Sequence, residues 1–310
     1  FGNLVAQTND TLTISGQESH NELWDGSMSH IHFTDGYAYD ASAFGETDAT
    51  TGEWKIKTSP SVTYGNTGYF ILKDGNSVTD QSGNSNNFTV GGGTLTKTED
   101  CPSNVFCTLN PLNQTNSGAV FSNGNNKMTI SGQWLGINST LFMESGKYYW
   151  EYKIDGLYGE FGVCEQGKAG QSDPQGNSGF YFLYNNGNTT GYIFNNVSGQ
   201  STSTITCTAF ASGMIINLAY DADNKALYIG QNGTWLNSGD PTSGASKTGA
   251  LITNLYPRVN RTIVPFCGHG ISSNTANYED NFRQGYFGTT AVASPNADAY
   301  GLGTLEYALP

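Results

Sequence analysis

Three acidic residues lie close together in the sequence and could act as acid and base on a sugar: Glu151, Asp155 and Glu160. A retaining glycosidase needs two carboxyl groups about 5–5.5 Å apart. Residues two apart on a strand share a face at a separation of about 6.6–7 Å, so Glu151 and Asp155, which are four apart, lie about twice as far from each other. The spacing favours a solvated strand face over catalysis, and a polysaccharide-degrading enzyme remains the alternative.

The histidines and the nucleophilic residues indicate no catalytic centre either. His30 and His32 are two apart on an expected strand and therefore share a face, but two ligands do not make a transition-metal site. The sequence contains no G-x-S-x-G nucleophile motif. We therefore expect a hydrogen-bonded surface pair at His30 and His32, and no enzyme activity.

Five cysteines are present, and none of them forms a C-x-x-C pair, which argues against a structural zinc site. Cys101 and Cys107 flank a short loop and are the candidate disulfide, although connectivity cannot be deduced from sequence alone. Because the number of cysteines is odd, at least one thiol lies outside any bridge within the chain.

A turn-rich segment over residues 74–87 gathers many side-chain oxygens. Asp74, Asn76 and Asp80 are candidate ligands for Ca²⁺, which takes about 6–8 oxygen ligands. The spacing does not match an EF-hand loop, and Asx-turns, in which the side chain bonds to its own backbone, account for the same residues without a metal. The second explanation is favoured, and calcium is the one candidate cofactor.

Aromatic and amide side chains gather around an expected hairpin, and this is a combination that binds sugars. The candidate binding residues there are Tyr181, Tyr184, Asn185, Asn188 and Tyr192. Loops and turns on a rigid scaffold commonly carry recognition. The alternative is that Tyr181 and Tyr192 only pack the hairpin.

Trp235 is the last candidate binding residue, and it is also a candidate core residue. It follows Asn232-Gly233, a pair that favours the positive φ angles of a tight hairpin turn. With Trp150, its large indole would fill the space between two packed sheets.

Strands must position all of these side chains. Alternating runs such as 29–33, 148–154 and 215–220 are separated by clusters of Gly, Asn and Asp, and a period of two in short runs predicts strands. Convincing helical patterns with caps are absent. Many short strands and few helices predict an all-β sandwich or barrel.

The charge balance excludes one class of partner. Thirteen Lys and Arg stand against 26 Asp and Glu, a net charge of −13, which repels a phosphate backbone, so we expect no nucleic-acid binding. A membrane helix needs about 20 consecutive apolar residues, and the apolar runs are only a few residues long. We therefore expect no membrane span.

A series of motifs in the second half of the chain resembles SPRY domains. The segments are GKYYWEYKI at 146–154, FGVC at 161–164, MIINLAYD at 214–221, ALYIGQNGTW at 226–235, YPRV at 256–259 and PFCG at 265–268. This resemblance implies a concanavalin A-like jelly-roll β-sandwich over residues 90–284. It also implies a binding surface made by the loops near 165–178 and 236–250.

Residues 1–89 resemble the C-terminal part of a laminin-G-like unit, which has the same sandwich architecture. The segments are WDG at 24–26, FGE at 44–46, GEWK at 52–55 and GYFIL at 68–72. The resemblance implies that the early strands of this unit lie before Phe1. It also implies a calcium site, which such units often hold.

The join between the two units, at residues 80–111, and the tail from 281 onward are similar to large structural proteins of bacteriophages. Residues 285–310 are expected to be a C-terminal strap or linker. The resemblance implies a non-enzymatic virion surface protein, a tail fibre or capsid decoration, assembled in the host cytoplasm. It would bind a host glycan or neighbouring virion proteins through the sandwich loops, as a homo-oligomer and as a trimer in a fibre. A purely structural shell or filament subunit is a further alternative.

Overall fold

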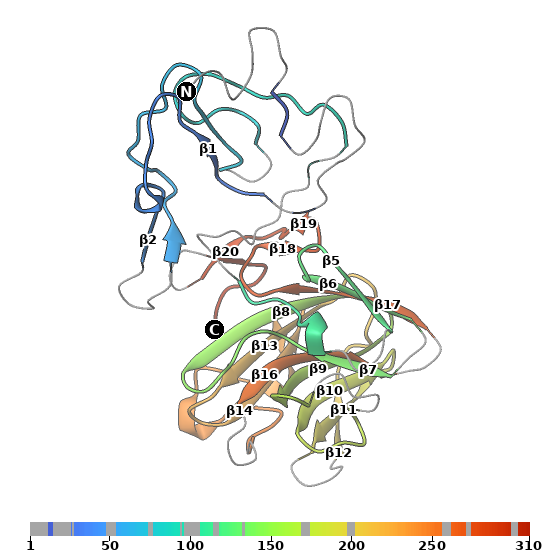
Figure 1. The fold of residues 1–310 in the computed structure, drawn as a ribbon. Coiled ribbons are helices and arrows are strands. Elements are labelled where there is room, and N and C mark those ends of the chain that lie inside the picture. Colours follow the sequence, from blue (N-terminus) through green and yellow to red (C-terminus); the bar gives the residue numbers. More distant parts are fainter. Residues whose placement is uncertain are drawn as a thin grey trace. The chain divides into compact units, whose positions relative to one another are not determined.

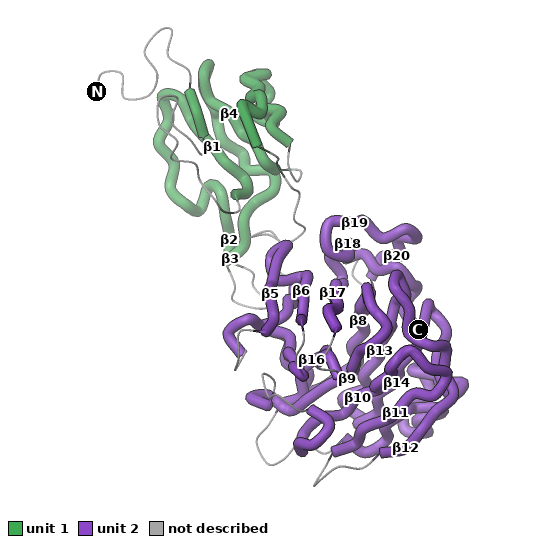
Figure 2. Tube along the Cα trace, turned by 90° about the vertical axis from the view of Figure 1, so that its right-hand side faces the viewer, with its two compact units in different colours: residues 1–95 green, residues 96–310 purple. Residues whose placement is uncertain are grey.

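The computed structural model divides the chain into two compact units, Phe1–Leu95 and Thr96–Pro310, coloured separately in Figure 2. The residues that the structure describes are 12–14, 26, 28–47, 54–73, 77–93, 95, 106–113, 118–131, 134–168, 174–196, 202–255, 262–270, 274–298 and 303–310. The division falls after residue 95, six residues later than the predicted boundary at 89.

The described part of unit 1 contains two antiparallel strand pairs. β1 (Ile31–Phe33) pairs with β4 (Tyr69–Ile71), and β2 (Gly45–Thr47) pairs with β3 (Trp54–Ile56). A short 3-10 turn, η1 (Ala41–Ala43), precedes β2. Phe70 and Ile71 are buried, and the His32 ring stacks on Phe70 with a centroid distance of 4.0 Å. Within these described segments the strands form two-stranded sheets, so a laminin-G-like sandwich stays a prediction.

Unit 2 is built on two antiparallel sheets, seen in Figure 1. The first has six strands in the order β12-β11-β10-β9-β16-β7. Their bounds are β7 (Leu135–Asn138), β9 (Tyr158–Glu165), β10 (Phe180–Asn186), β11 (Thr190–Asn195), β12 (Thr202–Thr206) and β16 (Ile263–His269).

The second sheet has seven strands in the order β15-β14-β13-β8-β17-β6-β5. Their bounds are β5 (Ala119–Ser122), β6 (Lys127–Ser131), β8 (Lys147–Asp155), β13 (Ile215–Asp221), β14 (Ala226–Gln231), β15 (Thr234–Trp235) and β17 (Thr275–Asn281). The prediction of an all-β sandwich is confirmed. The helical elements among the described residues of this unit are the 3-10 turns η2 (Pro111–Asn113), η3 (Leu236–Ser238) and η4 (Gly244–Ser246).

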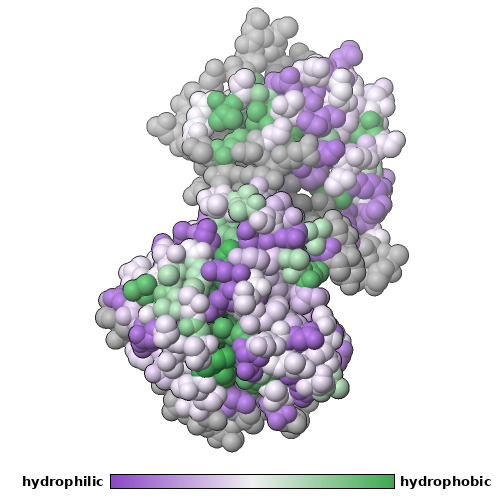
Figure 3. Space-filling view, turned by 180° about the vertical axis from the view of Figure 1, so that it is seen from behind, coloured by the Kyte–Doolittle hydropathy of each residue, from purple (hydrophilic) through white to green (hydrophobic). Residues whose placement is uncertain are grey.

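The core lies between the two sheets and follows the alternation of the strands. On β8, Trp150 and Tyr152 are fully buried, and on β9, Phe161 and Val163 are fully buried, all four in one hydrophobic cluster. Neighbouring residues on each strand therefore point to the outer face of their sheet. The core role of Trp150 is confirmed. On the face seen in Figure 3, hydrophobic residues form patches among neutral and hydrophilic ones.

Trp235 is not a core residue of the sandwich. It is partly buried and packs with Tyr149, Ala219 and Tyr228 in a separate small cluster. Tyr149 precedes the core residue Trp150 on β8, so this cluster lies on the outer face of the seven-stranded sheet. The turn before Trp235 is as predicted, because Asn232 and Gly233 both have positive φ, 48° and 78°.

The last residues of the chain belong to unit 2 and are not a separate linker. They form two small strand pairs, β18 (Tyr286–Phe287) with β19 (Thr290–Ala291) and β20 (Asn296–Ala297) with β21 (Thr304–Leu305). Phe287 and Leu305 are buried. We call residues 285–310 the C-terminal strap. None of the described segments is a helix long and apolar enough to cross a membrane.

Candidate functional site

A row of side chains crosses the outer face of the six-stranded sheet. Glu160 of β9 is directly opposite Tyr184 of β10, and Tyr184 is opposite Tyr192 of β11. Their chain neighbours Phe161, Leu183 and Ile193 belong to the core. Because side chains alternate along a strand, Glu160, Tyr184 and Tyr192 all face outward.

Tyr184 and Tyr192 form a cross-strand aromatic pair that reaches solvent. Their ring centroids are 6.1 Å apart, and Tyr192 is 36% exposed. Partial burial, followed by the nearby Glu160 carboxylate, raises the pKa of Tyr184 to about 12. The Tyr184 hydroxyl therefore keeps its proton at neutral pH and can donate a hydrogen bond.

Glu160 lies next to Tyr184 on the adjacent strand and is fully buried. Its Oε1 accepts a hydrogen bond from Nε2 of Gln175 at 2.8 Å. Gly268 is opposite Glu160 on β16, and a Cβ there would come within 2.7 Å of Glu160 Oε2. A Cβ on Gly270 would come within 2.6 Å of the Tyr184 ring and 2.8 Å of Glu160 Oε1. The two glycines make the room that the carboxylate and the ring occupy.

The loop before β10 is fixed by one buried amide. Asn196 donates from Nδ2 to the carbonyls of Pro174, Gln175 and Asn177 at 3.3, 3.2 and 3.0 Å. Asn196 is fully buried. Its three hydrogen bonds attach the loop that carries Gln175 to the sheet. We call Gln175, Tyr184, Asn186 and Tyr192, together with the buried Glu160 beside them, the tyrosine face.

The hairpin places some of the predicted binding residues elsewhere. Tyr181 is fully buried in the core between the sheets. Asn185 is fully buried, donates to the Asn188 carbonyl at 2.7 Å, and accepts from the backbone N–H of Gly187 at 2.9 Å. Asn185 therefore holds the turn. Tyr181 and Asn185 were both predicted to bind a ligand. Both predictions are wrong, because odd-numbered positions of β10 face inward.

The other two predicted residues divide between the two sides of the sandwich. Asn188 is exposed at the hairpin turn, and its Nδ2 donates to Oδ1 of Asn186 at 2.8 Å, so it borders the tyrosine face. Trp235 lies on the outer face of the other sheet, edge-on to Tyr149 at 6.2 Å. It cannot act together with Tyr184 and Tyr192, so its inclusion in one site was wrong.

The predicted calcium segment is a hydrogen-bonded turn at Asp80. Both oxygens accept protein donors: Oδ1 from the N–H of Phe70 (2.8 Å) and Ser82 (2.9 Å), and Oδ2 from the Ser82 hydroxyl (2.7 Å) and the N–H of Asn86 (2.9 Å). Burial alone would raise the pKa of Asp80, but these bonds outweigh it and lower the pKa below its usual value. Asp80 fits the Asx-turn explanation. Asp74 and Asn76 lie outside the described residues, so their role stays a prediction.

Cys107 is a free thiol in the structure. The Thr140 hydroxyl donates to its Sγ at 3.7 Å, and burial raises its pKa to about 12. The expected disulfide is therefore not formed here. Its other half, Cys101, lies outside the described residues.

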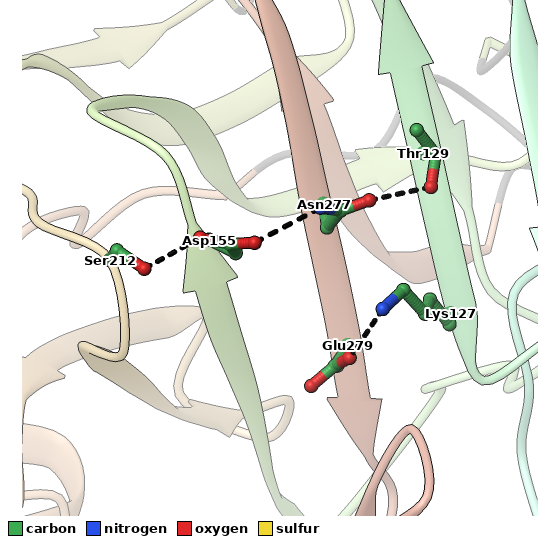
Figure 4. Close-up of polar contacts among 6 residues, drawn as sticks. All are labelled: Lys127, Thr129, Asp155, Ser212, Asn277 and Glu279. Atoms are coloured by element: carbon green, nitrogen blue, oxygen red, sulfur yellow. Dashed lines mark hydrogen bonds and ion pairs between the residues drawn. The ribbon is translucent and has the colours of Figure 1, made fainter.

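The outer face of the seven-stranded sheet carries a ladder of polar side chains, drawn in Figure 4. Asp155 accepts from the Ser212 hydroxyl at 2.6 Å and from Nδ2 of Asn277 at 3.1 Å, and Asn277 in turn accepts from the Thr129 hydroxyl at 2.6 Å. Lys127 and Glu279 form an ion pair at 2.9 Å in the next row. The bonds from Ser212 and Asn277 lower the pKa of Asp155.

Glu151 on the same face is occupied by the C-terminal strap. Its Oε1 accepts from the Tyr149 hydroxyl and the N–H of Tyr307, both at 2.9 Å. Its Oε2 accepts from Nδ2 of Asn281 at 3.0 Å and the N–H of Glu306 at 2.9 Å. Burial raises the pKa of Glu151 in spite of these bonds. Glu151 and Glu160 face opposite sides of the sandwich, so they do not form a catalytic pair.

Sequence reasoning missed Gln175, Asn196, Gly268 and Gly270 as parts of the site. Gln175 and Asn196 act through a loop whose path no local pattern predicts. The two glycines carry a weaker signal, because glycine inside a strand pattern marks a close approach.

The comparisons with known proteins found likeness in structure alone. No family model matches the sequence, and no curated protein matches it. The SPRY domain of human HERC1 is similar at 16% sequence identity, over 56% of this chain and 96% of that domain, with a TM-score of 0.41. The PSpry domain of TRIM65 is similar at 10% identity, over 56% of this chain and 90% of that domain, with a TM-score of 0.40. The function is therefore inferred from the chain's own geometry.

Proposed function

We propose that unit 2 is a non-catalytic binding module that recognises a glycan through the tyrosine face. The observation that carries the proposal is the solvent-reaching pair of Tyr184 and Tyr192, with the buried carboxyl group of Glu160 next to Tyr184 in the same cross-strand row. Binding sites combine apolar and aromatic surface with a few fixed polar groups, and this face has both.

The side chains of the face match the chemistry of a sugar. Two tyrosine rings offer flat apolar surface to the C–H groups of a pyranose. The amides of Gln175 and Asn186 and the Tyr184 hydroxyl offer hydrogen bonds to its hydroxyl groups. The loop and strands beneath are fixed by Asn196 and by the sheet, so little ordering is needed on binding.

The charge on this face favours a neutral glycan over an acidic one. The Glu160 carboxylate lies next to Tyr184 on the adjacent strand, and the whole chain carries a net charge of −13. A sialylated or sulfated sugar would bring a further negative charge close to that carboxylate, where water screens it poorly.

Binding without catalysis agrees with the arrangement of the acidic residues. Asp155 and Glu151 are held by hydrogen bonds within the chain, and Glu151 faces away from Glu160 across the core. Sheets of a sandwich pack about 10 Å apart, well beyond the carboxyl separation of a retaining glycosidase.

The setting we propose is the surface of a virion, as a fibre or capsid decoration that binds a host glycan or a neighbouring subunit. Its support is the resemblance of the join at residues 80–111 and of the tail to bacteriophage structural proteins. Electron microscopy of particles that contain this protein tests the setting. A tyrosine face buried between subunits would select the purely structural role.

A glycan array tests the binding proposal. The unchanged chain should bind neutral glycans, and Tyr192→Ala should weaken that binding at least tenfold, because it removes half of the aromatic surface. Tyr37→Ala is the matched control: Tyr37 is 50% exposed, stacks on Tyr39 and belongs to unit 1, not to unit 2. Equal glycan binding by the unchanged chain and Tyr192→Ala would refute the proposal, as would binding confined to sulfated or sialylated sugars.

A further inference from the structure

β12 is an edge strand of the six-stranded sheet, and its own residues carry none of the side chains that usually protect an edge. In the strand order, β11 is its one neighbour among the described strands. Its sequence is TSTIT, and Thr202, Ser203, Thr204 and Thr206 are exposed. Natural sheets block their edges with charged side chains, proline, bulges or a covering segment. β12 carries no charge, no proline and no glycine.

The opposite edge of the same sheet shows the contrast. β7 is buried along its whole length. The backbone N–H of Asn110 donates to the carbonyl of Asn138 at 2.9 Å, and Leu109 forms an antiparallel β-bridge with Ser139. The chain therefore covers one edge of this sheet with its own backbone and exposes the side chains of the other.

The hydrogen-bond pattern shows which groups of β12 point outward. The N–H of Cys207 donates to the carbonyl of Thr189, directly opposite, at 3.0 Å. Because hydrogen-bonded and non-hydrogen-bonded pairs alternate in an antiparallel ladder, residues 205 and 203 also bond to β11. Residues 202, 204 and 206 then direct their N–H and C=O groups toward the open edge.

We propose that β12 pairs with β12 of a second copy of this chain, antiparallel and centred on Thr204. With Thr204 opposite its own copy, Thr202 lies opposite Thr206 of the second chain, and each of these pairs is of the hydrogen-bonding kind. The pairing therefore offers about six backbone hydrogen bonds. Threonine meets threonine along the outer face, a favourable cross-strand pair.

Charge permits this contact between two acidic chains. Each copy carries a net charge of −13, but no charged residue lies in β12, so no like charges meet directly at the seam. Five residues on each side make a small contact, and small contacts are weak. The dimer is therefore expected to depend strongly on protein concentration.

The pairing has a consequence for the tyrosine face. Thr204 is opposite Tyr192 on β11, and a twofold axis normal to the sheet keeps both outer faces on the same side. Tyr192 of one chain and Tyr192 of the second copy would lie three strand spacings apart, about 14 Å. Two glycan sites on one continuous sheet would bind a repeating polysaccharide with avidity.

Sedimentation velocity of the whole chain, over a hundredfold range of concentration and without glycan, tests the pairing. The unchanged chain should shift from one chain to two as concentration rises. Thr204→Pro removes an outward N–H without touching the bonds to β11, and Thr204→Lys places two positive charges opposite each other. Each variant should raise the dimer dissociation constant at least tenfold.

Val120→Lys is the matched control, because Val120 is 66% exposed on β5, the edge strand of the other sheet. It should dimerise like the unchanged chain. Thermal melting of every variant shows that it is folded, and Thr204→Lys keeps the proposal testable if Thr204→Pro unfolds. An unchanged chain that is monomeric throughout would overturn the proposal, and so would dimers that survive both Thr204 variants or are lost in Val120→Lys. No glycan is present in this experiment. A failure of the dimer proposal can therefore be distinguished from a failure of the proposed glycan binding.

Discussion

The two outer faces of the sandwich each hold a buried glutamate, and the chain treats them differently. Glu151, on the seven-stranded sheet, accepts four hydrogen bonds, two of them from the backbone of the C-terminal strap. Glu160, on the six-stranded sheet, accepts from Gln175 and lies in one row with two tyrosines that reach solvent. Glu151 holds the C-terminal strap against the sheet. Glu160 lies beside a surface that could contact another molecule.

A buried carboxylate is therefore not by itself a sign of catalysis or binding. What distinguishes the two is the origin of the groups that cover them. The donors to Glu151 come from β8, β17 and the strap of the same unit. Beside Glu160, the aromatic pair leaves flat, partly apolar surface open to solvent, which is the more informative feature.

The largest expected effect is at the covered face. Glu151→Ala removes the acceptor for the N–H groups of Glu306 and Tyr307 and for the Asn281 amide. Because buried donors without acceptors are costly, the free energy of unfolding should fall by about 2–5 kcal/mol. Urea denaturation measures it.

Two variants control this result. Glu151→Gln keeps one carbonyl acceptor and should lose less stability than Glu151→Ala. Glu144→Ala changes an exposed glutamate and should stay within about 0.5 kcal/mol of the unchanged protein. A Glu151→Ala protein as stable as Glu144→Ala would mean that the contact between Glu151 and the strap does not stabilise the fold. The contrast drawn between Glu151 and Glu160 would then be wrong.

A smaller effect on stability, with a large one on binding, is expected at the open face. Gly270→Ala places a Cβ within 2.6 Å of the Tyr184 ring and 2.8 Å of Glu160 Oε1, so the ring must move. We expect a loss of about 1–3 kcal/mol in stability, as for other overpacked sites, and loss of neutral-glycan binding. Denaturation and a glycan array measure the two.

Gly92→Ala is the matched control, because a Cβ there has open space around it. It should change neither quantity. If Gly270→Ala bound glycans as well as Gly92→Ala, the ring position would not matter, and the tyrosine face would lose its main support.

The third and smallest effect concerns a carboxyl group that belongs to neither face. Asp280 alternates with Glu279 and faces the core, where burial raises its pKa well above the usual value. The folded state therefore holds a proton that the unfolded state has released, so stability should fall as pH rises from about 4, the ordinary aspartate pKa, through the raised value. Asp280→Asn, which cannot ionise, should flatten this dependence.

Thermal melting at a series of pH values measures that slope. Asp223→Asn is the matched control, because it makes the same substitution at an exposed position. Identical slopes for the unchanged protein and Asp280→Asn would show that Asp280 titrates normally. The comparison would then rest on Glu151 and Glu160 alone.

Local alternation was enough to predict several of the strands and one of the two candidate core tryptophans. The run 148–154 lies within β8, and Trp150 is buried as its parity with Tyr152 and Ile154 requires. The same parity argument separates Tyr181 from Tyr184, because an odd spacing on one strand places them on opposite faces. Parity therefore shows that Tyr181 and Tyr184 cannot share one site, and the structure shows that Tyr181 is the buried one.

The rest depended on contacts between distant segments. Trp235 is on a two-residue strand, too short for alternation to assign its face. Glu160 meets Tyr184 through the register of β9 with β10, which the residues between them do not reveal. Asp80 is occupied by the N–H of Phe70, ten residues away on β4. Such contacts follow from register and loop path, which no local pattern contains.

The strap contact has a mechanical consequence. A pull on Pro310 reaches the body of unit 2 first at Tyr307 and Glu306, whose backbone is tied to one side chain, and only then at Thr304, which bonds to Arg283. Load on this end would therefore peel the strap away from Glu151 one bond at a time, while the long strands beneath stay intact. The hydrogen bonds to the Glu151 carboxylate would therefore break before the strands of the sandwich separate.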